Sequence, residues 1–188
     1  MDLLATIDDV ESALGRDLSE PERIKVLPIL GKASELFRRH AGQTFTPGTS
    51  EVRLKVNGGR VYLPQRPVEE VSSVLDDLGG AVEYTWRQQW LTVDLASHEF
   101  VIVSYSHGGE VPDLVRLTVA DVARQVLSIA KEAASGATQT STTSGPYTDS
   151  ATYAAWAVGG QTRLAPDDVA TARSFRVRPP KIIVMSSP

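Results

Sequence analysis

Residues 19–42 read SEPERIKVLPILGKASELFRRHAG, and this stretch decides the fold. Ser19 suits the N-cap of a helix, Pro21 its first turn, and Glu22 the reciprocal capping position. Apolar residues follow at spacings of four, three and four, which places them on one helical face: Val26, Leu30, Ala33 and Phe37. A glycine, Gly42, can end the helix in a left-handed conformation. The stretch therefore predicts a long amphipathic helix with one side ready to pack.

A second long helix is predicted over residues 112–134, and a short one over residues 6–15. Pro112 and Asp113 give the second long helix a favourable N-terminus. Its apolar seam steps by four, three, four and three through Val115, Val119, Val122, Val126 and Ile129. Thr6 followed by Asp9 resembles a capping box for the short helix, which Gly15 would end. We expect the two long helices to pack antiparallel as the stable core.

The stretch between the long helices, residues 51–106, predicts antiparallel strands. Apolar and polar residues alternate there in short runs, which is the period of half-buried strands. The runs are separated by Asn57-Gly58-Gly59 and by Gly79-Gly80, and Gly108-Gly109 follows the last run. Because the connections are short, we expect a meander in which neighbouring strands pair, beginning with a hairpin about Gly58.

Residues 135–188, which we call the arm, differ from the rest in composition. The arm begins with SGATQTSTTSG, seven Ser or Thr and two Gly, which predicts a loop or flexible strap. A weak strand pattern follows over residues 148–156, and Asp167-Asp168 begins a predicted short helix to Ser174. Pro179-Pro180 enforces extension before the apolar residues 182–185. The expected domains are a body, residues 1–134, and an extended C-terminal arm, so the fold class is α+β: a small helical bundle with an antiparallel β insertion.

Composition excludes several classes of protein. The chain has 188 residues, with 19 Lys and Arg against 23 Asp and Glu, a net charge of −4 that disfavours a nucleic-acid-binding protein. It has no cysteine, which excludes disulfides, thiolate zinc sites and cysteine nucleophiles. No apolar run approaches the roughly 20 residues of a membrane helix, and Met1-Asp2-Leu3-Leu4 lacks a basic signal region, so a cytosolic site of assembly is expected.

The sequence offers no constellation of catalytic, cofactor-binding or metal-ligating residues, so it predicts no enzyme. The three histidines, His40, His98 and His107, have no partner at metal spacing. Residues 104–109, SYSHGG, lack a nucleophile elbow, and Ser106 and His107 would point to opposite faces of a strand. The glycine pairs precede no Lys-Ser/Thr helix start, as a phosphate loop would. Trp86 and Trp90 flank Arg87, a weak stacking motif for nucleic acid that a packing role in a hairpin explains better.

The order of these pieces resembles the head-to-tail adaptor proteins, also called head-completion or connector proteins, of long-tailed bacteriophages of actinobacteria. Four stretches carry the resemblance together with the helix ending AGQTF: ATIDDVE through Leu14-Gly15-Arg16, LPQRPV leading to VSSV, VIVSYSHGG followed by VPD and a helix, and GPYTDSATY. They span most of residues 5–153, and their order and spacing are more specific than any one of them.

This resemblance implies a ring, commonly of twelve subunits, beneath the portal at the capsid vertex. The ring would bridge the portal to the next neck or tail protein, with packaged DNA passing through it without specific binding. No cofactor is implied. The protein would be assembled in the bacterial cytoplasm and reside in the virion neck. We expect the arm to bind acidic surface through basic residues and an apolar groove through its tip, on the portal or on a neighbouring subunit: Arg173, Arg176, Arg178 and Lys181, then Ile182, Ile183 and Val184.

Three other functions remain open at this stage. A stopper or tail-completion protein would occupy the same neck but is usually a β-rich barrel, which the two long helices disfavour. A nucleic-acid-binding regulator conflicts with the acidic charge, and an enzyme conflicts with the lack of a catalytic constellation. The copy number of the ring, and the surface that faces the portal, do not follow from the sequence.

Overall fold

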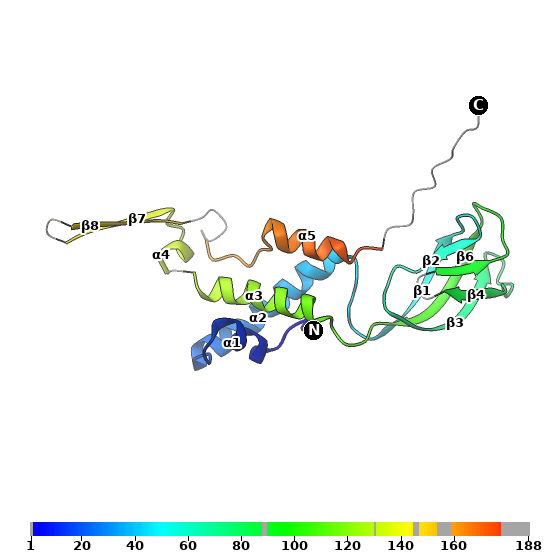
Figure 1. Ribbon diagram of the computed structural model, residues 1–188, viewed down its shortest axis with the longest axis horizontal. Helices are drawn as coiled ribbons and strands as arrows, with labels where there is room; N and C mark the ends of the chain where they lie inside the picture. The colour runs from blue at the N-terminus through cyan, green and yellow to red at the C-terminus, as the bar shows by residue number, and fades with distance from the viewer. Residues whose placement is uncertain (1, 88–89, 130, 145–146, 154–158, 178–188) are drawn as a thin grey trace, which may run out of the picture. The chain divides into compact units, whose positions relative to one another are not determined.

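The computed structural model describes residues 2–87, 90–129, 131–144, 147–153 and 159–177, and its α+β fold confirms the predicted class (Figure 1). The chain forms two compact units. Unit 1 comprises Met1–Ala41 and Val111–Ser174, and unit 2 comprises Gly42–Glu110 and Phe175–Pro188. Unit 1 carries the helices, and unit 2 carries the β insertion. No helix within the described ranges has both the length and the apolar character needed to cross a membrane.

The first helix of unit 1, α1 (Ile7–Leu14), begins and ends as predicted. The Thr6 side chain accepts a hydrogen bond from the Asp9 backbone N–H at 3.2 Å. In return the Asp9 carboxylate accepts from the Thr6 N–H at 2.8 Å, which completes the capping box. Gly15 ends the helix with φ at 69°, a left-handed conformation that suits glycine.

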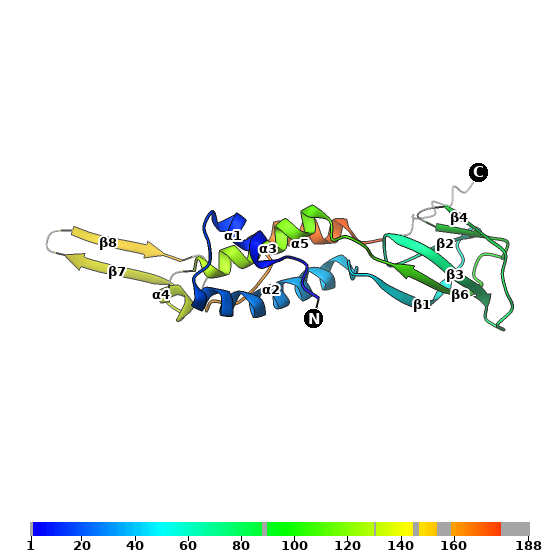
Figure 2. The ribbon, with the colours of Figure 1, turned by 90° about the horizontal axis from the view of Figure 1, so that it is seen from below.

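The two long helices, α2 (Glu20–Ala41) and α3 (Asp113–Leu127), pack against each other and run in opposite directions (Figure 2). The predicted face of α2 is fully buried at Val26, Leu30, Ala33 and Phe37. Residues Val115, Val119 and Val122 of α3 are buried with at most 1% of their surface exposed. The antiparallel helical core is therefore confirmed. Burial of these two apolar faces against each other stabilises unit 1.

An ion pair and a buried hydrogen bond tie the N-terminus to this core. Arg116 of α3 donates to Asp9 of α1 at 2.9 Å, and the Asp9 side chain is only 10% exposed. The Leu4 N–H donates to the buried Ser34 hydroxyl of α2 at 3.0 Å. Leu4 itself is 1% exposed, so the segment before α1 belongs to the core.

The prediction of one uninterrupted helix over residues 112–134 is wrong after Leu127. The structure ends α3 there and resumes with a single turn, α4 (Lys131–Ala134). The Ser128 hydroxyl donates to the Arg124 carbonyl at 2.8 Å, and the Ser128 N–H bonds back to Arg124 and Gln125. Such local hydrogen bonding competes with continuation of a helix. The predicted end at Ala134 is confirmed, because Gly136 closes α4 with φ at 104°.

Unit 2 contains two antiparallel three-stranded sheets that share one apolar core (Figure 1). The first has the order β1-β6-β3, with β1 Gly48–Lys55, β6 Phe100–His107 and β3 Val68–Asp76. The second has the order β2-β5-β4, with β2 Arg60–Tyr62, β5 Trp90–Val93 and β4 Tyr84–Arg87. Their shared core is aliphatic apart from one tyrosine: Val56, Val61, Leu63, Val71, Val74, Leu91, Val93, Val101, Val103 and Tyr105.

The predicted antiparallel pairing is confirmed, but the predicted meander is wrong. The turn at Gly58-Gly59 is present, since the Asn57 N–H donates to the Arg60 carbonyl at 2.9 Å and both glycines have positive φ. The strands on either side of it nevertheless separate, because β1 pairs with β6 and β2 pairs with β5. A turn fixes the reversal of the chain. The burial of the apolar faces decides which strands pair afterwards.

The arm contains regular structure within unit 1. The prediction of a loop over residues 135–145 is wrong, because β7 (Gln139–Ser144) pairs with β8 (Tyr147–Thr152) as a two-stranded antiparallel sheet. Threonine favours strands even in a sequence without large apolar residues. The predicted short helix is confirmed as α5 (Pro166–Ser174), where the Asp168 carboxylate accepts from the Ala165 N–H at 3.0 Å. Ala172 of α5 is fully buried.

Candidate partner-binding surfaces

The structure describes two of the seven predicted partner-binding residues. Arg173 is exposed in the last turn of α5, and Arg176 is exposed just after the chain passes from unit 1 into unit 2. The other five lie outside the described residues: Arg178, Lys181, Ile182, Ile183 and Val184. We call Phe175–Val177 the arm root and residues 178–188 the arm tip.

The arm root is fixed to unit 2 by an aromatic pair. The Phe175 ring meets the Phe45 ring edge to face, with centroids 5.4 Å apart and an interplanar angle of 86°. Phe45 is only 4% exposed and has a positive φ of 61°, a costly conformation for a bulky side chain that surrounding contacts must hold. The Arg176 stem lies over Gly42, where an added Cβ would be 3.7 Å from its Cγ. The origin of the arm tip is thereby set by packing.

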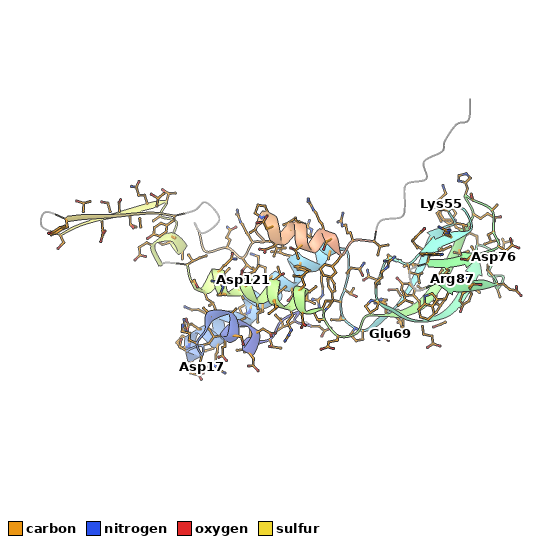
Figure 3. The ribbon with its side chains drawn as sticks, viewed as in Figure 1. Asp17, Lys55, Glu69, Asp76, Arg87 and Asp121 are labelled. Carbon is orange, nitrogen blue, oxygen red and sulfur yellow. The ribbon has the colours of Figure 1, made fainter. Side chains whose placement is uncertain are left out.

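A cavity of about 500 Å³ lies beside the arm root within unit 2. It has apolar walls and two cationic side chains, and the residues that line it are Gly42, Leu54, Lys55, Asn57, Tyr62, Pro64, Arg176 and Val177. Figure 3 labels Lys55 at the end of β1. An apolar side chain flanked by a carboxylate would match this lining, because the carboxylate could pair with Lys55 or Arg176.

Two glutamines support the wall of this cavity. The Gln43 side chain donates to the Pro64 carbonyl at 2.6 Å and accepts from the Arg66 N–H at 2.8 Å. In the opposite direction, the side-chain oxygen of Gln65 accepts a hydrogen bond from the Thr44 N–H at 2.8 Å. These bonds join the segment after α2 to the segment after β2. Sequence patterns assign these glutamines no role, because Gln43 stands between Gly42 and Thr44, Gln65 stands between Pro64 and Arg66, and neither setting indicates a buried hydrogen bond.

Buried Tyr105 continues the same network. Its phenolic oxygen accepts from the Gln65 N–H at 3.1 Å. Burial raises the pKa of the Tyr105 phenol, and the Gln65 N–H acts in the opposite direction because it favours the anion. The buried Tyr105 side chain is therefore held neutral and accepts a hydrogen bond from the segment that carries Gln65.

The Ser/His stretch of β6 behaves as predicted, but a distant serine joins it. Ser106 and His107 alternate between the faces of β6, and His107 is 4% exposed. Its Nε2 lies 2.8 Å from the hydroxyl of Ser50 on β1, a pairing that the sequence did not reveal. A catalytic histidine also needs a group that orients its other nitrogen. Among the described residues, the buried Nδ1 of His107 has no hydrogen-bond partner.

The predicted packing role of the two tryptophans is supported for Trp90 and not for Trp86. Trp90 of β5 lies 6.3 Å from the Tyr62 ring, and the Arg60 guanidinium lies 5.2 Å from its centroid. Trp86 is 41% exposed and sits opposite Leu91 in the β4–β5 hairpin. No group of three or more His, Asp or Glu side chains that could hold a metal ion occurs in the part of the chain that the structure describes.

Unit 1 exposes two pairs of large apolar side chains. Ile24 and Leu27 of α2 are 74% and 46% exposed. Leu114 and Leu117 of α3 are 55% and 56% exposed. Each pair is spaced by three residues and so lies on one face of its own helix. Burying either pair against a partner would be favourable.

No protein-family model matches this chain, and no curated protein matches it.

Proposed function

We propose that this protein is a structural component of a phage virion neck, forming a ring between the portal and the next neck or tail protein, with DNA passing through its channel. The observation that carries the proposal is the arm root. Phe175 packs on Phe45 in unit 2, and the chain then continues into residues 178–188, which hold two cations and an apolar run. A firmly anchored origin followed by a segment of this chemistry is suited to joining one protein to another.

The exposed apolar pairs support a ring. Neighbours in a ring use two different surfaces of each subunit, because the contact is heterologous. Unit 1 offers one pair on α2 and another on α3, and both pairs are exposed in the part of the chain that the structure describes. The net charge of −4 also suits a channel through which DNA slides without binding.

Another neck component, a stopper or tail-completion protein, is the second candidate. Unit 2 favours it, since two three-stranded sheets around one core approach the β-rich architecture expected of that class. The helical core of unit 1 favours the adaptor. We propose no catalytic activity and no specific binding of nucleic acid.

Sedimentation velocity of the full chain, with and without the portal protein of the same virion, tests the proposal. We expect a monomer or weak oligomers in dilute solution and a ring on the portal, because two small apolar pairs give weak single contacts. A gel shift at physiological salt should show only weak DNA binding that salt removes. A stable dimer in both conditions, or tight binding to DNA, would contradict the adaptor proposal.

A further inference from the structure

The β7–β8 hairpin is a two-stranded sheet with a regular register from Gln139–Thr152 to Ser144–Tyr147 (Figure 2). No third strand in the described ranges pairs with it. Every residue of β8 is exposed, and Tyr147 is 79% exposed. Because an isolated two-stranded hairpin is marginally stable in water, the hairpin lacks the burial that normally stabilises a sheet.

Both outer edges of this hairpin also lack the usual protection. Proteins shield exposed edges with lysine, proline, bulges or a covering segment. Neither strand contains Lys, Arg or Pro, and Asp149 of β8 is the one charged residue in the two strands. The pairing has no register shift, in contrast to β3–β6, where two occur. Among the described residues no strand pairs with the outer edge of β7 or of β8, so either edge can accept another strand.

We propose that this hairpin pairs edge to edge with the hairpin of a second copy of the chain, β8 of one copy against β7 of the next. The inference rests on the proposed ring and identifies the segment that joins its subunits. Because β7 and β8 are antiparallel, placing copies side by side in one orientation puts β8 antiparallel to the neighbouring β7. Each added copy then extends the sheet in the same orientation as the copy before it. Closure of the ring pairs the last free edge with the first, so that no free edge is left.

Charge favours this arrangement over a two-fold dimer. A two-fold pairing of β8 with a second β8 centred on Asp149 would place this carboxylate directly opposite its own copy, and like charges directly opposite destabilise a sheet. Pairing β8 with β7 brings Asp149 to a strand that carries no charge. Six-residue strands form few hydrogen bonds, so one contact is weak and many equivalent contacts in a ring are needed for a stable sheet.

The absence of cysteine from the chain permits a clean cross-linking test. Ser141→Cys chains are mixed with Ser150→Cys chains at increasing concentration under mild oxidation, so that any disulfide joins two copies. Within one copy these residues are directly opposite and so share a face of the hairpin. Registers shifted by two residues are covered by the mixtures of Ser141→Cys with Thr152→Cys and of Gln139→Cys with Ser150→Cys.

We expect one of these three mixtures to give mainly disulfide-linked dimers, while each single variant alone stays monomeric. The matched control mixes Ser141→Cys with Ala151→Cys, which lies on the opposite face and should give little product. The proposal is overturned if no mixture gives product up to the solubility limit. It is also overturned if the opposite-face control reacts equally well, or if Ser150→Cys alone gives the product.

A second variant separates this proposal from the proposed function. Residues 139–152 are replaced by Asn-Gly, which is feasible because the Tyr153 N–H already donates to the Thr138 carbonyl at 3.0 Å. We expect unit 1 to keep its helical circular dichroism and the ring on the portal to be lost. Rings that still form without the hairpin would overturn the hairpin proposal and leave the adaptor standing. Cross-linked open chains that never close on the portal would support the hairpin and contradict the adaptor.

Discussion

Val122 lies in the apolar seam of α3, with 1% of its surface exposed. Val122→Asp should unfold unit 1, because it buries a carboxylate without a partner and costs several kcal/mol. Leu117→Asp on the same helix is the matched control, since Leu117 is 56% exposed and a charge there stays in water. Thermal melts followed by far-ultraviolet circular dichroism distinguish the two. A Val122→Asp protein that melts like Leu117→Asp would mean that the seam is misassigned.

His107 should make the stability of unit 2 depend on pH. Burial lowers the pKa of the His107 imidazole below its ordinary value of 6.5, although Glu69 acts in the opposite direction. As the pH falls through about 6.5, the unfolded chain binds the proton first, so the unfolding free energy decreases until the folded pKa is reached. His107→Gln can keep a hydrogen bond to Ser50 and cannot titrate.

Urea unfolding between pH 5 and 8 checks this prediction. The loss of stability below about pH 6.5 should be smaller in His107→Gln than in the wild type. His98→Gln serves as the control, because it removes an exposed imidazole from the same unit and leaves the buried His107 in place. Equal slopes in the wild type and in His107→Gln would show that His107 does not contribute.

Single residues were predictable from the sequence where the chemistry is local. The capping box of Thr6 and Asp9 and the glycine at position 15 each act over four residues or fewer, so the sequence pattern contains the whole interaction. The contact of Ser50 with His107 joins residues 57 positions apart. Gln43 with Pro64 and Phe45 with Phe175 are likewise distant in sequence, and only the tertiary fold brings each pair together.

The end of β6 depends on one glycine. Gly108 has φ at 97°, and its N–H donates to the Pro67 carbonyl at 2.9 Å. A Cβ there would overlap the Thr46 carbonyl. Gly108→Ala should therefore reduce the unfolding free energy by more than the about 1–3 kcal/mol that a strained backbone conformation alone costs.

Gly79→Ala supplies the comparison in the same unit. Gly79 has φ at 84°, but an added Cβ would meet nothing within 4 Å, so this variant measures the conformational cost alone. Denaturant unfolding of both variants gives the contribution of close packing as the difference. If the two changes were equal, the contact with Thr46 would relax freely and the packing argument would fail.

The sequence predicted which segments form helices or strands better than it predicted which strands pair with each other. The alternation and the turn residues of residues 51–106 identified antiparallel strands, and the 3.6-residue period identified α2 and α3. The separation of β1 from β2 after a correctly predicted turn depends on long-range burial, which periodicity cannot express. The strand β7 was missed because its Ser and Thr give no apolar pattern, whereas the weak strand pattern predicted over residues 148–156 overlaps β8.

The division into two units follows from the way the chain crosses between them. Unit 2 is inserted between α2 and α3, and the chain returns to it after Ser174. Composition changes at residue 135 suggested a boundary there, yet α5 contributes the fully buried Ala172 to unit 1. A low-complexity stretch shows only where the composition of the chain changes. A compact unit is defined instead by the apolar surfaces that share one core, so the two boundaries need not coincide.

Removal of the arm tip is the decisive change at the scale of the whole molecule. Deleting residues 178–188 keeps the Phe175–Phe45 contact, whereas deleting residues 175–188 would also expose the Phe45 ring. The shorter deletion should leave the melting temperature of the free protein unchanged while it abolishes stable joining of heads to the neck.

Reversing the two charges of the arm tip, with Arg178→Glu and Lys181→Glu together, should weaken joining in a salt-dependent way if the tip binds an acidic surface. Arg163 is an exposed basic residue elsewhere in the arm, so Arg163→Glu is the matched control and should not weaken joining. Infectious particles at normal yield from the deleted chain would show that the arm tip is dispensable.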